Sequence, residues 1–432
     1  MKKIEFTLAT PVRRLLDRYE HLNWALLDQA MVSGINFLVG ILLVRYLGIE
    51  EYGQYVLAYM IVQFFMSVQN SLIIAPLFSI APKLEKPELP TYYSATFVMQ
   101  VALAIIIGCV FAIGASVLPG TITPSWLTLN LVVPIIACIV VIQLQDYVRR
   151  SLFSQGSFKR AFFLDLIAYG GQVLLILIVV RVHPSFEAAL FSISATMLLS
   201  FVLGLRYLNL VMPSRQEVHA VTKRHWLSAK WLLGSAILQW LSGNYFLIVV
   251  GAVFGPAIVG GIRAAQNLLG LSHILFQGLE NVVPGAASRR FQTRGVSGLT
   301  SYLKKVALMM LLGTGLIAAS AAIFSEPLLR LVYGAPNPSS VAAMIWFVPL
   351  YVLGATALPI RAGLRTLECT YPIFVAYALG AVLSVSVAHY LVSRYEINGA
   401  MGGMLFVDTM MTLVLLYSLS REVRKHANSL SS

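Results

Sequence analysis

Long apolar stretches recur along nearly the whole chain and are separated by short polar segments. Twelve of them can cross a bilayer as helices, because about 20 apolar residues span its hydrocarbon core. We expect these spans near residues 24–44, 54–79, 93–118, 126–145, 161–181, 187–207, 230–254, 257–283, 304–324, 341–361, 371–392 and 400–420. The pattern predicts an all-α polytopic membrane protein.

One stretch, residues 258–284, is too polar to lie wholly in lipid. Seven polar or charged side chains fall within an arc of roughly 140° when it is placed on a helix. They are Arg263, Gln266, Asn267, His273, Gln277, Glu280 and Asn281. Polar groups facing lipid are costly, so this stripe must face protein or water. Contacts between helices would explain any single amide, whereas the whole stripe favours a hydrophilic cavity.

Polar residues of three other spans extend the expected cavity lining. The candidates are Gln29 and Asn36 in the first span, Asn70 in the second, and Gln239 and Asn244 in the seventh. Small and hydroxylated residues on these faces, such as Ser33 and Gly40, are more typical of close helix packing.

Ionisable side chains at membrane depth are candidates for coupling transport to an ion, because a buried unpaired charge is costly. They are Asp28, Asp165, Glu280 and Asp408. Nearby arginines would also account for Asp28, Asp165 and Glu280. Arg263 is the best candidate for an anion, since a guanidinium grips phosphate through two hydrogen bonds. His273 is either a proton or ligand site or a hydrogen-bonded core residue, and Arg361 and Arg365 are either topological anchors or attract phosphate.

Composition agrees with a membrane protein and limits the chemistry. The chain has 432 residues, of which 58% are hydrophobic and 11% charged, and a mean hydropathy of +0.80, which excludes a soluble globular protein. The three cysteines, Cys109, Cys138 and Cys369, have unrelated spacings and predict neither a disulfide framework nor a metal site. The sequence contains no phosphate-binding loop motif for ATP. We expect no cofactor.

The net charge of +13 is explained by membrane topology rather than by nucleic acid. Under the twelve-span reading, 26 of the 31 basic residues lie on the side of the two termini. Because cytoplasmic segments carry the excess of Lys and Arg, both termini are predicted to be cytoplasmic. The expected divisions are a cytoplasmic N-terminal segment (1–22), a six-helix bundle (23–208), a cytoplasmic linker (209–229), a second six-helix bundle (230–420) and a cytoplasmic tail (421–432).

The two halves show a weak, ordered repeat. Gly48 and Gly53 in the first half match Gly255 and Gly260 in the second, and both pairs are five residues apart. Asn70 and Gln277 each lie 17 residues after the second glycine. The repeat predicts two parallel bundles related by an axis along the membrane normal, with a central cleft between them. Chance similarity between small residues in apolar sequence is the alternative.

The segment RYLGIEEYGQY (45–55), followed by a long second span, resembles polysaccharide transporters of the Wzx type. These belong to the multidrug/oligosaccharidyl-lipid/polysaccharide (MOP) exporter superfamily. The segments VGGIRAAQNLLG (259–270) and GLENVVPGAASRRF (278–291) are similar to the corresponding family segments. The resemblance implies a V-shaped transporter of the bacterial inner membrane, with a cationic cleft that Arg263, Arg361 and Arg365 match here.

The resemblance further implies a flippase that turns over a polyprenyl-diphosphate-linked glycan by alternating access. Membrane lipids and other polysaccharide assembly proteins are its expected partners. Two other functions stay open: cation-coupled multidrug efflux, and a membrane glycan polymerase or ligase. The polymerase would need a large outward loop with basic or His residues, whereas the predicted outward loops are short. We therefore expect a transporter rather than an enzyme.

Overall fold

The computed structural model describes residues 20–117, 129–182 and 184–428. This part of the chain consists of helices joined by turns, which suits a bilayer because a helix satisfies its backbone hydrogen bonds internally. Within it, ten helical stretches are long and apolar enough to cross a membrane. The predicted all-α polytopic fold is confirmed.

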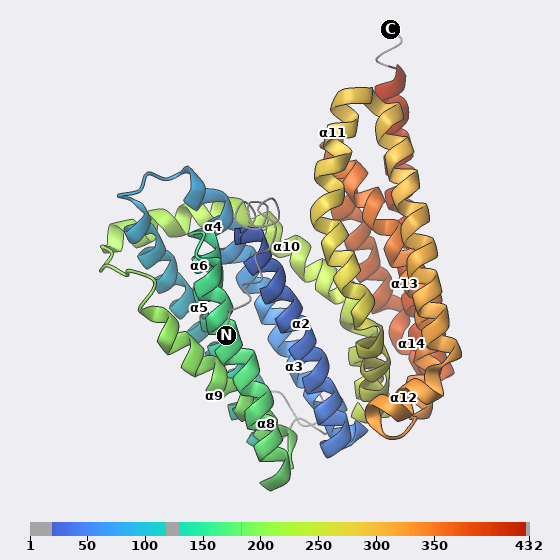
Figure 1. The fold of residues 1–432 in the computed structure, drawn as a ribbon, viewed down its shortest axis with the longest axis horizontal. Coiled ribbons are helices and arrows are strands. Elements are labelled where there is room, and N and C mark those ends of the chain that lie inside the picture. Colours follow the sequence, from blue (N-terminus) through green and yellow to red (C-terminus); the bar gives the residue numbers. More distant parts are fainter. Residues whose placement is uncertain (1–19, 118–128, 183, 429–432) are drawn as a thin grey trace, which may run out of the picture.

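The first group of helices is coloured blue to green in Figure 1. It comprises α2 (Glu20–Leu47), α3 (Ile49–Gln69), α4 (Ala75–Ile80), α5 (Leu89–Val117), α6 (Leu129–Ser154), α7 (Phe158–Asp165), α8 (Gly171–Val182) and α9 (Phe186–Leu205). The π-helical turns η1 (Asn70–Ile74) and η3 (Leu166–Gly170) join α3 to α4 and α7 to α8. Each of these two pairs therefore runs as one span, and the 3₁₀ turn η2 (Ala81–Lys83) follows α4.

The second group comprises α11 (Pro256–Ile323), α12 (Ser325–Tyr333), α13 (Pro338–Thr366) and α14 (Tyr371–Asn428). Both α11 and α14 double back, and the backbone turns at Gly295 (φ 62°) and at Glu396 (φ 52°). With these two turns, the helices account for all twelve predicted spans.

Helix α10 (Arg215–Phe254) connects the two groups and contacts α5 of the first and α14 of the second (Figure 1). A Ser214–Glu217 capping box starts this helix inside the predicted linker 209–229, so most of that linker is helical. The domain boundaries themselves stay a prediction.

The two groups converge at one end of the molecule and diverge at the other, which gives the V shape of Figure 1. The convergent end, here called the closed end, holds the α2–α3 and α10–α11 turns and α12. There Arg45 of α2 reaches the second group: its Nε donates to the Val332 carbonyl at 2.6 Å and its Nη2 to the Leu331 carbonyl at 2.5 Å. The divergent end is called the open end.

Glycines of the repeat shape the closed end. Gly48 (φ 86°, ψ 171°) precedes α3 and Gly255 (φ 83°, ψ 174°) precedes α11, so equivalent positions have the same backbone conformation, one that favours glycine. Gly53 and Gly260 then let α3 and α11 touch. A Cβ on Gly53 would lie 1.9 Å from the Pro256 carbonyl oxygen, and one on Gly260 would lie 2.3 Å from that of Ile49.

The substitution Gly53→Ala is expected to destabilise the closed end. The added methyl group meets backbone atoms of α11, which cannot rotate away, so the two helices must separate at a cost of about 1–3 kcal/mol. Thermal unfolding of the purified full chain in detergent should show a lower midpoint. Gly34→Ala is the matched control, because a Cβ on Gly34 of α2 meets nothing within 4 Å. Equal midpoints for both variants would contradict the prediction.

Candidate functional site

A cleft between the two helix groups contains two adjoining cavities. The Arg263 cavity, of about 350 Å³, is lined by α2, α3, α10 and α11, and lies beside the first turns of α3 toward the closed end. The Asn70 cavity, of about 550 Å³, is lined by α3, α6, α10 and the adjoining π-helical turns, farther along α3. Tyr59, Gln63, Trp240 and Asn244 line both cavities. Both volumes are within the range of small-molecule sites.

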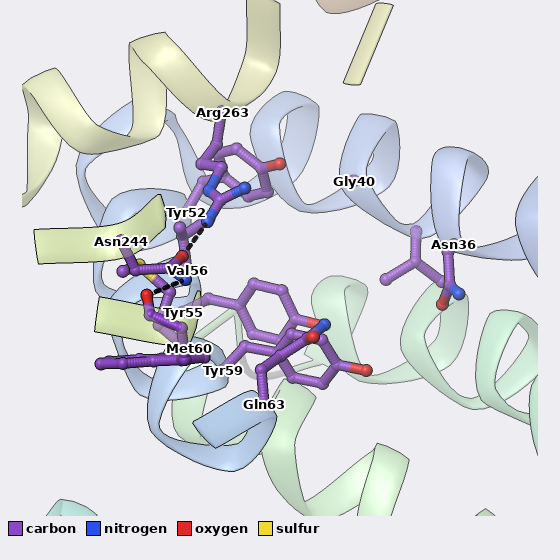
Figure 2. A pocket seen from close by; sticks show the side chains of 12 residues that line it. Asn36, Gly40, Tyr52, Tyr55, Val56, Tyr59, Met60, Gln63, Asn244 and Arg263 are labelled. Atoms are coloured by element: carbon purple, nitrogen blue, oxygen red, sulfur yellow. Dashed lines mark hydrogen bonds between the residues drawn. The ribbon is translucent and has the colours of Figure 1, made fainter. Parts of the chain in front are cut away.

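Arg263 of α11 points into the cleft and is held there by two neutral amides (Figure 2). Its Nη1 donates to Gln266 Oε1 at 2.6 Å, and its Nη2 donates to Asn244 Oδ1 at 3.1 Å. Asn244 is oriented in turn by donating to the Trp240 carbonyl at 2.9 Å. Among the described residues, no carboxylate forms an ion pair with Arg263. Its positive charge is therefore available to an anionic ligand.

A row of tyrosines on α3 forms one wall of the Arg263 cavity (Figure 2). The rings of Tyr52 and Tyr55 are stacked with centroids 6.3 Å apart, and those of Tyr55 and Tyr59 with centroids 5.6 Å apart. Sequence reasoning missed this wall, although residues 52, 55 and 59 have the spacing of one helix face. Aromatic residues at that spacing are typical of an ordinary core, so the signal was ambiguous.

Several predicted cavity residues lie in the cleft, and others are used for packing. Asn36, Asn244 and Arg263 line the Arg263 cavity, and Asn70, Gln239 and Asn244 line the Asn70 cavity. Gln266 supports Arg263. Asn267 instead packs α11 against α2: its Nδ2 donates to the Phe37 carbonyl at 3.2 Å and lies against Gly40. Gln29 donates to Ser33 within α2 at 3.2 Å.

The remaining candidates do not line either cavity, or their side chains lie outside the described residues. Arg361 of α13 lies near Asp408 of α14 and interacts with it electrostatically. Arg365 is exposed in the last turn of α13. Neither arginine is among the described residues that line the cleft. The side chains of His273, Gln277 and Glu280 lie outside the described residues. Their roles stay predictions.

Asp28 and Asp165, predicted as ion-coupling residues, meet in a buried cluster around Arg149. The Arg149 Nη2 lies 2.6 Å from Asp28 Oδ2, and its Nε is paired with Asp165 Oδ2. Gln145 Nε2 donates to Asp165 Oδ1 at 2.8 Å. These residues come from α2, α6 and α7, and all four are buried. The cluster thus joins three helices inside the first group.

A third acidic neighbour of Arg149, Asp146, connects this cluster to the cleft. Asp146 Oδ1 lies 3.9 Å from Arg149 Nη1 and 3.2 Å from Arg150 Nε. Asp146 and Arg150 both line the Asn70 cavity. The three aspartates and two arginines carry one net negative charge when all are ionised. A proton or a cation would neutralise it.

Comparison with known proteins gives the family and the fold. No curated protein matches the sequence. The family model described as polysaccharide biosynthesis protein matches residues 42–342. The fold is similar to the lipid II flippase MurJ in an inward closed conformation, with 13% identity, TM-score 0.70, and coverage of 95% of this chain and 91% of that chain.

The fold is also similar to a multidrug resistance MATE family transporter of the MOP superfamily in two conformations. The inward-facing structure has 12% identity and a TM-score of 0.67, and the outward-facing structure 13% and 0.63; each alignment covers 94% of this chain and 96% of the other. At these identities the likeness establishes the fold. The chain is a multi-pass membrane protein that belongs to the polysaccharide biosynthesis protein family and has the MOP superfamily fold.

Proposed function

We propose that this protein is a flippase that moves a polyprenyl-diphosphate-linked oligosaccharide across the bacterial inner membrane during surface polysaccharide synthesis. The observation that carries the proposal is Arg263, a cation inside the cleft whose hydrogen-bond acceptors are neutral amides. Holding such a charge away from bulk water is costly unless a ligand anion compensates it. A diphosphate provides that anion.

The rest of the cleft suits a sugar chain. Gln63, Asn70 and Gln239 are exposed amides in its wall and can both donate and accept hydrogen bonds with sugar hydroxyl groups. The lipid tail stays in the bilayer while the diphosphate and glycan occupy the cleft. Rocking of the two helix groups about the site would then expose it to one side at a time.

The direction of opening follows from the distribution of charge. The segments at the open end are rich in Lys and Arg. The closed end holds the ends of α2 and α8, helix α12 and the turn of α14 (Figure 1), and these contain four arginines: Arg45, Arg181, Arg330 and Arg394. By the positive-inside rule the open end faces the cytoplasm, as do both termini. This conformation would therefore receive the substrate from the side on which lipid-linked sugars are assembled.

Cation-coupled multidrug efflux remains the second candidate because the fold is similar to a MATE family transporter. The Arg263 charge argues against it, since a cationic drug in the same cleft would be repelled. Export driven by an ion is compatible with either function. Asp28 and Asp165 are the proposed coupling residues, because their cluster with Arg149 has one more carboxylate than it has arginines.

Reconstitution tests the proposal directly. The full chain in liposomes should move a fluorescent polyprenyl-diphosphate oligosaccharide between leaflets, measured as label that becomes accessible to a membrane-impermeant quencher. Protein-free liposomes and a cationic dye serve as comparisons. Movement of the dye but not of the glycan lipid would favour efflux. Lengthening of the glycan would instead indicate a polymerase, and no movement of either probe would contradict both transport functions.

A further inference from the structure

The junction of the two cavities is lined by two aromatic residues and two amides. Four side chains line both: Tyr59 and Gln63 on α3, and Trp240 and Asn244 on α10. On each helix an aromatic ring and an amide are four residues apart, so ring and amide share one helix face. A ligand long enough to extend from one cavity into the other passes along these two pairs.

The junction lies next to the anion site. Asn244 accepts a hydrogen bond from Arg263 at 3.1 Å and donates to the Trp240 carbonyl at 2.9 Å. Trp240 is one helical turn, or about 6 Å, nearer the open end than Asn244. That step is comparable to the separation of a phosphate from the ring of the sugar that it carries. A diphosphate bound by Arg263 would therefore place its first sugar near Trp240.

The indole of Trp240 is half-buried and braced from the first helix group. The Phe64 ring of α3 meets it edge to face with centroids 4.9 Å apart, so its orientation is held while it lines the cleft. An indole offers a broad apolar surface to the C–H face of a pyranose ring, and the neighbouring amides can bond the hydroxyl groups around the ring edge. Among the described residues that line the two cavities, Trp240 is the one tryptophan.

We propose that Trp240, with Tyr59, Gln63 and Asn244, forms a subsite for the first sugar of the substrate, the one attached to the diphosphate. The inference rests on the proposed function and adds the orientation of the substrate in the cleft. The diphosphate lies toward the closed end at Arg263, the first sugar stacks on Trp240, and the remaining glycan extends through the Asn70 cavity toward the open end. Trp240 thereby distinguishes a sugar-bearing carrier lipid from the bare diphosphate.

Binding of two probes to the purified full chain in nanodiscs tests this subsite. The probes are undecaprenyl diphosphate and undecaprenyl diphosphate carrying one N-acetylhexosamine. The measured quantity is the ratio of their dissociation constants, which a change in the fraction of folded protein leaves unaltered. Trp240→Leu keeps apolar bulk against Phe64 but removes the ring. It should weaken binding of the sugar-bearing probe about tenfold and leave that of the bare diphosphate nearly unchanged.

Three further variants separate the possible causes. Trp240→Phe keeps an aromatic surface and should retain most of the preference for the sugar. Trp231→Ala removes a tryptophan of the same helix that is 73% exposed and lies outside both cavities, so it should leave the ratio unchanged. Arg263→Ala should weaken both probes together.

An unchanged ratio in Trp240→Leu would overturn the subsite, and so would an equal loss for both probes. A ratio that falls equally in Trp240→Leu and Trp240→Phe would exclude ring stacking and overturn it too. Failure of the unaltered protein to bind either probe would instead refute the proposed function, and the subsite with it.

Discussion

Replacing Arg263 with Ala is expected to abolish movement of the glycan lipid in liposomes and to weaken its binding by at least about a hundredfold. The guanidinium can give a diphosphate two charge-assisted hydrogen bonds, each worth about 1.5–3 kcal/mol. Alanine removes the charge and leaves Asn244 and Gln266 without their donor, but Asn244 lines both cavities, where water can replace it, and Gln266 is only partly buried. The loss therefore reports on ligand binding rather than on the fold.

Two variants sharpen this experiment. Arg263→Lys retains the charge without the planar fork and should recover part of the binding. Arg330→Ala removes the same charge from an exposed position on α12 and should leave transport unchanged. Transport by Arg263→Ala at the rate of the unaltered protein, with equal amounts of protein in the liposomes, would remove this residue from the mechanism.

Replacing Arg149 with Met is expected to cause the largest loss of stability of any single change considered. Arg149 is the cation that compensates Asp28 and Asp165 inside the first helix group, and both carboxylates are buried. Removing one partner of a buried ion pair leaves uncompensated charge and typically costs about 3–5 kcal/mol. The unfolding midpoint in detergent should fall strongly.

Removing the carboxylate charges as well should reverse much of this loss. In the triple variant Arg149→Met, Asp28→Asn, Asp165→Asn no ionised group is stranded, so its midpoint should lie well above that of Arg149→Met alone. Arg150→Met is the matched control. Its guanidinium pairs with Asp146 at 3.2 Å but is 37% exposed, and such pairs contribute about 0–1 kcal/mol. A triple variant no more stable than Arg149→Met would contradict the electrostatic explanation.

The repeat was visible in the sequence because it depends on glycines at fixed spacing. Gly48 and Gly255 have a backbone conformation that other residues rarely adopt, and Gly53 and Gly260 permit contact between helices. Such requirements restrict the residue type itself. The tyrosine wall on α3 imposes no comparable restriction, because an aromatic residue at helical spacing serves a core as well as a cavity. The sequence alone therefore did not distinguish Tyr55 or Tyr59 from core residues.

The buried cluster around Arg149 shows a second limit of prediction from the sequence. Asp28 and Arg149 are 121 positions apart in the chain, and no local pattern connects them. Both aspartates were identifiable as ionisable groups at membrane depth. Their common partner, Arg149, was not identifiable, because its position in the sequence is typical of the basic residues that follow the end of a span.

The number and length of the spans follow from the chain alone, because the bilayer supplies an external frame of fixed thickness. Their direction stays a prediction from the distribution of basic residues. The function of each polar side chain depends instead on the rotation of its helix, which packing sets. Arg263 and Asn267 are one turn apart in the same polar stripe, yet Arg263 lines the cleft and Asn267 packs against Gly40. Contact between Gly53 and Gly260 holds α3 and α11 together and so helps to orient these side chains. Such a contact depends on two helices and cannot be predicted from the sequence of either one.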